Sequence, residues 1–413
     1  MLHRTSAEPV RNHITSEDRI LLLVLRGKRD FVQQQWHGNE PVDWERVVER
    51  VVAEDVYPLF YRNVCELNGK HGPAGALAQH LTPNTQNPTP DTEHLRSRTE
   101  PAFEQLGRLT KINAFRNALL AEELVRLLKL LDAAGIPAIP LKGPALAQEL
   151  YGDPSVRVCV DLDILVSRSM VRRAFELLCR DGYKGEFGPG FFAELLLRHD
   201  IEYALRRNDR GFEFMVELHW GVLWGGKDEE SITDKLWADA YATQVFDAPA
   251  YALSPEWQIL VLVAHAARHQ WQGLKWLVDL HELFSSPNID WNELIKKSKQ
   301  LGWEELLRIS LHACHRLFYT PVPENFSLGV LPGWVKVFPE KPSPETVRGA
   351  FFATRLLERT SEKVRYAARV LLVPTLAEWR LVSLPSFLAF LYYPLRPLRL
   401  TFKWGWAVLA KSW

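Results

Sequence analysis

The segment from Ile136 to Val166 constrains the fold of this chain more than any other part of its sequence. It has the pattern of a short strand over residues 137–141, a tight turn, a helix and a second strand. The turn falls at Gly143, and Pro144 suits a helix start because its fixed φ is helical and its missing N–H is not needed there. The free backbone N–H groups of such a start favour anions. We therefore predict an anion-binding turn at this position.

The second strand, predicted over residues 159–166, carries two carboxylates on one face. Because side chains alternate along a strand, Asp161 and Asp163 point the same way, about 6.6 Å apart at Cα. Two unpaired acids this close repel each other, and a divalent cation is their natural complement. The alternative is an acid pair at the sheet edge that arginines neutralise.

A third acid lies on a later predicted strand. The turn signal at residues 208–211 joins predicted strands over residues 201–206 and 212–220. In the second of these strands Glu217 and His219 share one face. Glu217 completes the candidate triad, whereas His219 either contacts metal, base or nucleotide or is a buried histidine with ordinary partners.

The order of these motifs resembles the polymerase-beta-like nucleotidyltransferase superfamily, and more narrowly a family of uncharacterised bacterial nucleotidyltransferases. The similarity rests on the Leu-Lys-Gly turn at residues 141–143, on Arg157 and on the Asp-Leu-Asp strand, and it spans about residues 100–320. The superfamily usually has serine or glycine after the turn glycine, whereas this chain has Pro144. The phosphate contact would then come from Lys142, Arg157 or the backbone.

The resemblance implies metal-dependent transfer of a nucleoside monophosphate from an NTP to a hydroxyl of an unknown small molecule, peptide or protein. The expected catalytic and metal-binding residues, for Mg²⁺ or Mn²⁺, are Asp161, Asp163 and Glu217. The expected nucleotide-binding residues are Lys142, Gly143, Arg157 and His219. Two alternatives stay open: a catalytically inactive nucleotide-binding or regulatory module of the same fold, and a metal-dependent phosphohydrolase. For Lys142 and Arg157 the alternative is a salt bridge to neighbouring acids.

Three further residues have chemistry that the triad does not use. His265 and His269 stand four apart on a predicted helix, a spacing that can hold zinc, but no third ligand is evident, so a structural or substrate-contacting role is the stronger interpretation. Asp279 lies on an apolar helix face, where an unpaired acid is costly. We expect it to pair with Arg268, His265 or Lys275.

Overall composition and cysteine spacing indicate which partners and which compartment to expect. Among the 413 residues, Lys plus Arg and Asp plus Glu number 50 each, so no strong nucleic-acid signal is present. The four cysteines are scattered without a C-x-x-C pair, which favours a reducing compartment. The apolar run at residues 20–25 is too short for a signal peptide. We expect a cytoplasmic protein, with peripheral contact to the inner face of the membrane as the alternative.

The predicted fold is α+β: a small mixed β-sheet nucleotidyltransferase core wrapped by N-terminal helices and a C-terminal helical bundle. The regions are an N-terminal helical region (1–100) with a flexible linker (69–101), the core (102–250), the bundle (251–320), a proline-rich connector (321–347) and a basic, aromatic helical tail (348–413).

The tail contains an uncharged run at residues 381–395 that is too short, and too interrupted by proline, to span a bilayer. Such runs usually belong to a core, so we expect it to pack on the helical bundle with its arginines in water. The alternative is a membrane interface, with Arg396, Arg399, Lys403 and Lys411 near anionic headgroups.

Overall fold

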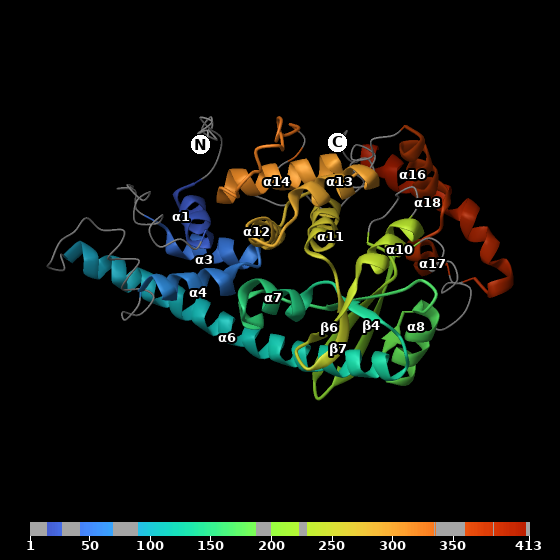
Figure 1. Cartoon of the computed structure of the whole chain (residues 1–413), viewed down its shortest axis with the longest axis horizontal. Helices are drawn as coiled ribbons and strands as arrows, with labels where there is room; N and C mark the ends of the chain where they lie inside the picture. Colours follow the sequence, from blue (N-terminus) through green and yellow to red (C-terminus); the bar gives the residue numbers. More distant parts are fainter. Residues whose placement is uncertain are drawn as a thin grey trace.

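The computed structural model describes residues 15–26, 42–68, 90–186, 200–222, 229–333, 335, 360–382 and 384–409. The sequence also suggests a short helix near residues 191–198. That segment and most of the linker predicted over residues 69–101 lie outside these ranges. The fold is α+β, as predicted, with helices on both sides of a small mixed sheet (Figure 1).

A five-stranded sheet, in the order β1-β2-β5-β4-β3, forms the centre of the predicted core. β2 and β5 are parallel, and every other neighbouring pair is antiparallel. The strands are Ala138–Pro140 (β1), Leu162–Val166 (β2), Lys184–Gly185 (β3), Glu202–Asp209 (β4) and Phe212–His219 (β5). The predicted strands are confirmed, although β2 begins at Leu162 rather than at residue 159.

The helices between these strands follow from turn chemistry. α7 (Gly143–Tyr151) begins at the predicted turn, and η1 (Pro154–Val156) is a 3₁₀ turn capped by the Asp153 side chain. α8 (Val171–Arg180) follows β2 and ends where Gly182 takes a φ of +94°. The spacing of Val171, Phe175 and Leu178 in the sequence predicts a helix over residues 168–180, and α8 confirms it.

The two faces of the sheet belong to different hydrophobic cores. Leu162, Ile164, Val216 and Leu218 pack in one core with the C-terminal half of α6 (Pro90–Ala133) and with α8. Leu165, which alternates with its neighbours in β2, belongs to the second core, which includes the helices that follow the sheet. The face that carries Asp163 and Glu217 is therefore turned toward those later helices.

The apolar spacing of residues 43–65 in the sequence predicts one helix, but the segment forms two helices. α3 (Trp44–Ala53) and α4 (Tyr57–Asn68) are separated by a break in which Asp55 has a φ of +56°. The single-helix prediction was wrong because Pro58 lacks an N–H and its ring would clash with the carbonyl one turn earlier. α1 (Ser16–Leu25) precedes them and is capped by the Thr15 side chain.

The long helix α6 joins the N-terminal helices to the sheet. With 44 residues it is about 66 Å long, and in the view of Figure 1 it runs below the N-terminal helices and below the sheet. The linker prediction was wrong for residues 90–101, which are helical. That prediction used low aliphatic content as its criterion, whereas polar residues such as Glu and Arg are also good helix formers.

The helical bundle after the sheet shares its core with the N-terminal helices. Arg26 donates to the carbonyl of Leu317, and Glu54 accepts from the N–H of Leu274. Two elements that the sequence did not suggest, a helix and a hairpin, connect the sheet to the bundle. The elements are α10 (Glu229–Asp239), β6 (Tyr241–Val245), β7 (Ala248–Ala252), α11 (Pro255–Arg268), α12 (Leu274–Phe284), α13 (Trp291–Leu301) and α14 (Glu304–Phe318).

The C-terminal tail is helical, as predicted, and comprises α16 (Thr360–Leu372), α17 (Leu376–Leu381), η2 (Ser386–Leu391) and α18 (Tyr392–Leu409). Its small apolar cluster includes Tyr203 of β4 but, in the described part of the chain, no residue of α11–α14. The predicted packing on the bundle was wrong. Arg396 and Arg399 also do not extend into water, because both bind the buried Glu378. Among the helices described, none is long and apolar enough to cross a bilayer.

Candidate functional site

Parallel pairing of β2 with β5 brings the predicted acids together. Asp163 lies directly opposite Glu217 in the register, and His219 lies two residues further along the same face. Ligand atoms of Asp163, Glu217 and His219 all lie within 4.8 Å of one another. The structure thus brings together two of the three predicted acids with the predicted histidine.

His219 bridges the two carboxylates of this cluster. Its Nε2 lies 3.1 Å from Asp163 Oδ1 and 3.6 Å from Glu217 Oε2. Burial alone would lower the pKa of His219, but its contacts with Asp163 and Glu217 outweigh burial and raise that pKa to about 9. In this state the imidazolium supplies positive charge between the acids.

Lys142 supplies a second positive charge. Its Nζ lies 2.8 Å from Asp163 Oδ1 and 3.3 Å from His265 Nδ1. Burial favours a raised pKa for Asp163, yet Lys142 and His219 dominate and hold the pKa of Asp163 well below its usual range. Lys142 therefore forms the salt bridge that the sequence left as its alternative to phosphate binding.

The turn that positions Lys142 requires glycine at residue 143. Gly143 has a φ of +66°, and a Cβ there would lie 3.3 Å from the carbonyl oxygen of Asp161. The N–H of Leu141 donates to the carbonyl of Asp163, which locks the turn against β2. The start of α7 is thus held beside the acids, as the predicted anion-binding turn requires.

Asp161 precedes β2 and stands outside the tight cluster. Burial, together with the charges of Asp163 and Glu217, raises the pKa of Asp161 to about 6. Burial is the largest cause of this rise in pKa, the two neighbouring carboxylates add to it, and Lys142 opposes it. Carboxylate oxygens are the ligands of a hard divalent cation, so the acids present are compatible with the metal that the sequence predicts.

Glu202 and Arg268 form a layer behind His219 that sequence reasoning missed. Glu202 pairs with His219 in the hairpin register, and its Oε2 lies 3.5 Å from His219 Nδ1. Arg268 of α11 binds both oxygens of Glu202, at 2.6 and 2.9 Å. Counting outward from the turn at Gly211 would have placed Glu202 opposite His219, because the register of a hairpin is fixed by its turn.

Arg157 is directed away from the acids. Its Nε donates to Asp279 Oδ2 at 2.9 Å, and the Tyr151 hydroxyl donates to the other oxygen at 2.8 Å. Arg157 is 7% exposed and Asp279 is 1% exposed. The structure favours an ion pair for Arg157 over the predicted phosphate contact. The prediction that Asp279 pairs with Arg268, His265 or Lys275 was wrong, because its partners are Arg157 and Tyr151.

His265 and His269 form no metal cluster in the part of the chain that the structure describes. Their rings are 4.8 Å apart, and Trp276 stacks on His269 at 4.2 Å. Burial, with the charge of Lys142, lowers the pKa of His265 well below its ordinary value. A neutral His265 can accept a hydrogen bond from Lys142 at Nδ1, which supports the structural interpretation.

A comparison with protein families now identifies the chain. A profile described as "Uncharacterised nucleotidyltransferase" matches residues 40–319, which include every residue of the site described above. The chain belongs to this family. The matched range starts before α3 and ends after α14, so the family similarity covers the sheet together with the helices that pack on both sides of it.

Other comparisons add less. One solved structure, an antigenic nucleotidyltransferase-like protein from Paracoccidioides brasiliensis, matches with 19% identity and a TM-score of 0.27, over 48% of this chain and 92% of that one. At such a TM-score the two chains do not superimpose as whole folds. No curated protein gives a significant match.

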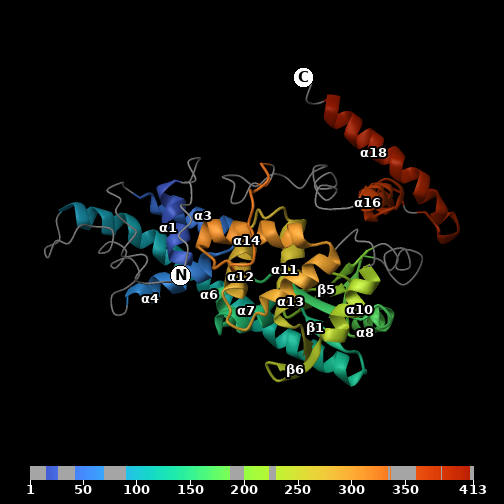
Figure 2. The same ribbon diagram turned by 45° about the horizontal axis from the view of Figure 1, so that its top comes forward.

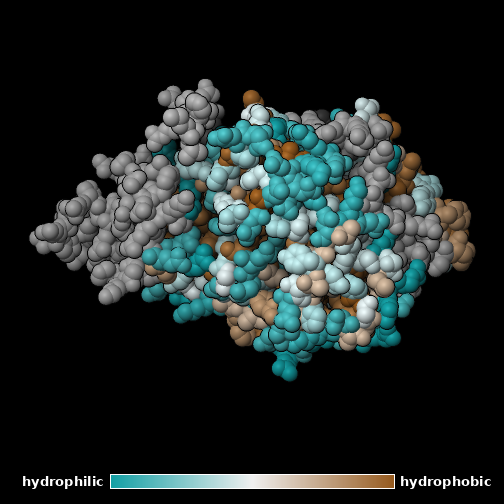
Figure 3. Space-filling model, viewed as in Figure 1, coloured by the Kyte–Doolittle hydropathy of each residue, from teal (hydrophilic) through white to brown (hydrophobic). Residues whose placement is uncertain are grey.

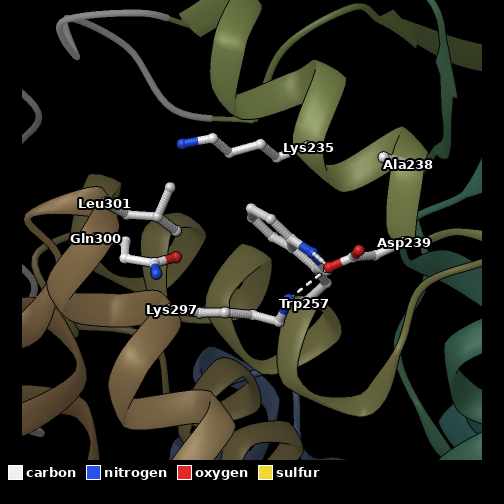
Figure 4. Close-up of a pocket in the computed structure, with 7 residues that line it drawn as sticks. All are labelled: Lys235, Ala238, Asp239, Trp257, Lys297, Gln300 and Leu301. Atoms are coloured by element: carbon white, nitrogen blue, oxygen red, sulfur yellow. Dashed lines mark hydrogen bonds and ion pairs between the residues drawn. The ribbon is translucent and has the colours of Figure 1, made fainter.

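Two cavities in the described part of the chain are lined by residues other than the acids. One, of about 210 Å³, lies between α10, α11 and α13, where Lys297 and the Trp257 indole both bind Asp239 (Figure 4). Another, of about 320 Å³, lies between α7 and the β6–β7 hairpin. Neither of these two cavities is lined by a residue of the triad, so a ligand there would not contact the acids directly.

Proposed function

We propose that the protein is a metal-dependent nucleotidyltransferase that moves a nucleoside monophosphate from an NTP to a hydroxyl acceptor. The observation that carries this proposal is the cluster of Asp163, Glu217 and His219, with Asp161 and the Gly143 turn beside it. Family membership supports the reaction class, and the closely placed carboxylates of Asp163 and Glu217, with Asp161 nearby, support a cation.

In the proposed site, Asp161, Asp163 and Glu217 would hold Mg²⁺ or Mn²⁺. Such an ion, when bound, neutralises phosphate charge and polarises the phosphoryl group. Lys142 leaves its salt bridge with Asp163 and pairs with the triphosphate as a point charge, a change that Asp163 tolerates once it has another cation. The N–H groups at the start of α7 donate to a phosphate oxygen, which replaces the missing serine hydroxyl.

The proposed chemistry is an in-line displacement. The acceptor oxygen forms a bond to the α-phosphorus, the bond from that phosphorus to the bridging oxygen breaks, and pyrophosphate leaves. Glu217, which is more exposed than Asp163, takes the proton of the acceptor hydroxyl. His219 is fixed by Asp163 and Glu202, so it orients Glu217 by the contact at Nε2.

The experiment is to incubate the protein with each α-labelled NTP in turn, with Mg²⁺ or Mn²⁺ and a cell extract. The proposal predicts a labelled acceptor and release of pyrophosphate with wild type, and neither with Asp163→Asn. Release of phosphate without a labelled acceptor would favour a phosphohydrolase. Thermal stabilisation by an NTP without pyrophosphate release would favour the binding module, which the Lys142–Asp163 salt bridge and the absence of the serine also suit.

A further inference from the structure

Exposed apolar side chains are concentrated in the C-terminal tail. Of the eighteen large hydrophobic residues that are exposed in the described part of the chain, eleven lie between Val364 and Phe402. The other seven are scattered over the body of the protein, where isolated exposed apolar residues are normal. A group of this size in one short segment indicates an interaction surface.

Some of these residues form a stripe that starts at Leu391, the last residue of η2, and continues along α18. Leu391, Leu398 and Phe402 are 38%, 56% and 77% exposed, and with Pro394 they follow the three- and four-residue spacing of one helix face. Tyr392, Arg396 and Leu400, which lie away from the stripe, are buried. The stripe is therefore the outer face of an amphipathic helix.

The turn before α18 extends this surface. In η2, Phe387 and Phe390 are 76% and 62% exposed. Figure 2 shows α16 and α18 standing out from the body of the molecule, and Figure 3 shows hydrophobic residues at the end of the molecule where these helices lie. The aromatic surface is thus at an accessible extremity.

The charge of the same segment is strongly positive. After residue 360 the chain has eight Lys or Arg residues and two acids, Glu362 and Glu378. Glu378 is 0% exposed and binds Arg396 and Arg399, so these three residues together keep one net positive charge, and Arg380 is paired with Glu186. Lys363 and Arg365 are exposed on α16.

We propose that this tail docks the protein on an anionic lipid bilayer, with α18 lying flat in the interface. Exposed Phe and Leu beside basic residues are the pattern of an interfacial helix, in which apolar side chains enter the headgroup region and cations meet the anionic lipid. None of the described helices can span the bilayer. Pairing with a second copy of the tail is disfavoured because two surfaces of the same charge would meet. The inference is independent of the proposed nucleotidyl transfer.

The test is flotation of the full chain with vesicles of phosphatidylcholine alone or mixed with phosphatidylserine. We expect most of the protein to float with the anionic vesicles and little with the neutral ones. Raising the salt from about 0.1 M to about 1 M shortens the Debye length from about 10 Å to about 3 Å, so flotation should fall several-fold. Equal flotation with both lipids, or none with either, overturns the proposal.

Variants distinguish membrane binding by the stripe from nonspecific adsorption of exposed apolar residues elsewhere. Leu398→Ser with Phe402→Ser should lower the partition coefficient at least about tenfold, because two exposed apolar side chains would no longer enter the bilayer. The matched control is Ile112→Ser with Phe115→Ser on α6, where exposure is 63% and 69%, and it should float like wild type. Melting curves and any NTP turnover in solution should be unchanged in both double variants.

Equal loss in both double variants, or no loss in the tail variant, would contradict the proposal. Loss of a dimer in the tail variant, seen by size-exclusion chromatography without any vesicle binding by wild type, would instead assign the surface to a second copy of the chain.

Discussion

Replacing Arg157 by methionine should destabilise the protein by about 3–5 kcal/mol, because the change leaves the Asp279 carboxylate buried without a countercharge. The magnitude follows from burial. Burial acts to lower the pKa of Arg157, yet the charge of Asp279 outweighs it and holds that pKa above its ordinary value. Burial and the Asp279 charge likewise raise the pKa of Tyr151 well above its ordinary range. Both partners thus stabilise a charged carboxylate at this position.

A double-mutant cycle isolates the ion pair. Arg157→Met with Asp279→Leu removes both charges and should recover most of the lost stability, since a well-packed apolar pair often replaces a buried ion pair at little cost. Tyr151→Phe keeps the ring and the ion pair but removes one hydrogen bond to a charged group, so it should cost only about 1.5–3 kcal/mol.

Urea denaturation measures each variant, with the midpoint compared at constant m-value. Thermal stabilisation by an NTP, measured in parallel, distinguishes the ion pair from a phosphate ligand. If Arg157→Met stays within about 0.5 kcal/mol of wild type while NTP binding weakens, the reasoning is refuted and the guanidinium contacts phosphate.

Three further outcomes follow from the site and its surroundings. Asp161→Asn and Asp163→Asn should each reduce metal-dependent turnover at least about a hundredfold, measured as pyrophosphate release, while circular dichroism shows the fold retained. Mg²⁺ or Mn²⁺ should raise the melting temperature, by the equivalent of about 2.7 kcal/mol at a metal concentration of a hundred times the Kd. This rise in melting temperature should be smaller in Glu217→Gln. An equal rise in wild type and variant would remove Glu217 from the set of metal ligands. Burial, together with the nearby charge of Glu202, raises the pKa of Asp200 from 3.8 to about 6. The folded state therefore binds this proton more tightly than the unfolded state does. As a result, the charged carboxylate of Asp200 lowers the free energy of unfolding above pH 6 but not below pH 4. Asp200→Asn should therefore raise the free energy of unfolding by up to about 3 kcal/mol at pH 7 and leave it unchanged at pH 4, and an equal effect at both pH values would contradict the assignment.

The acids of the site could be predicted because their signals are local. Alternation along β2 and β5 placed Asp163, Glu217 and His219 on polar faces, and the glycine turn marked the start of α7. Parallel pairing of the two strands is a tertiary event, so the direct register of Asp163 with Glu217 needed the structure.

The partners of the positive residues could not be predicted from the sequence alone. Arg157 is near Asp161 in the chain, but it pairs with Asp279 on α12, 122 residues away. Lys142 likewise contacts a residue that is distant in the chain, His265 on α11. The long side chains of Lys and Arg can reach partners on several helices or strands, and tertiary packing determines which partner they contact. The hairpin β6–β7 was missed because Pro249 interrupts the pattern of β7, whose register with β6 is nonetheless continuous.

The hydrophobic core shared by the N-terminal helices and the bundle has a consequence for synthesis of the chain. Leu21, Val47 and Phe60 emerge from the ribosome long before α14, which ends at Phe318 and completes their core. At roughly 5–20 residues per second, that delay is on the order of ten seconds to a minute. During this time the apolar faces of the N-terminal helices lack their final partners, so chaperone capture of nascent chains that end before α14 is expected.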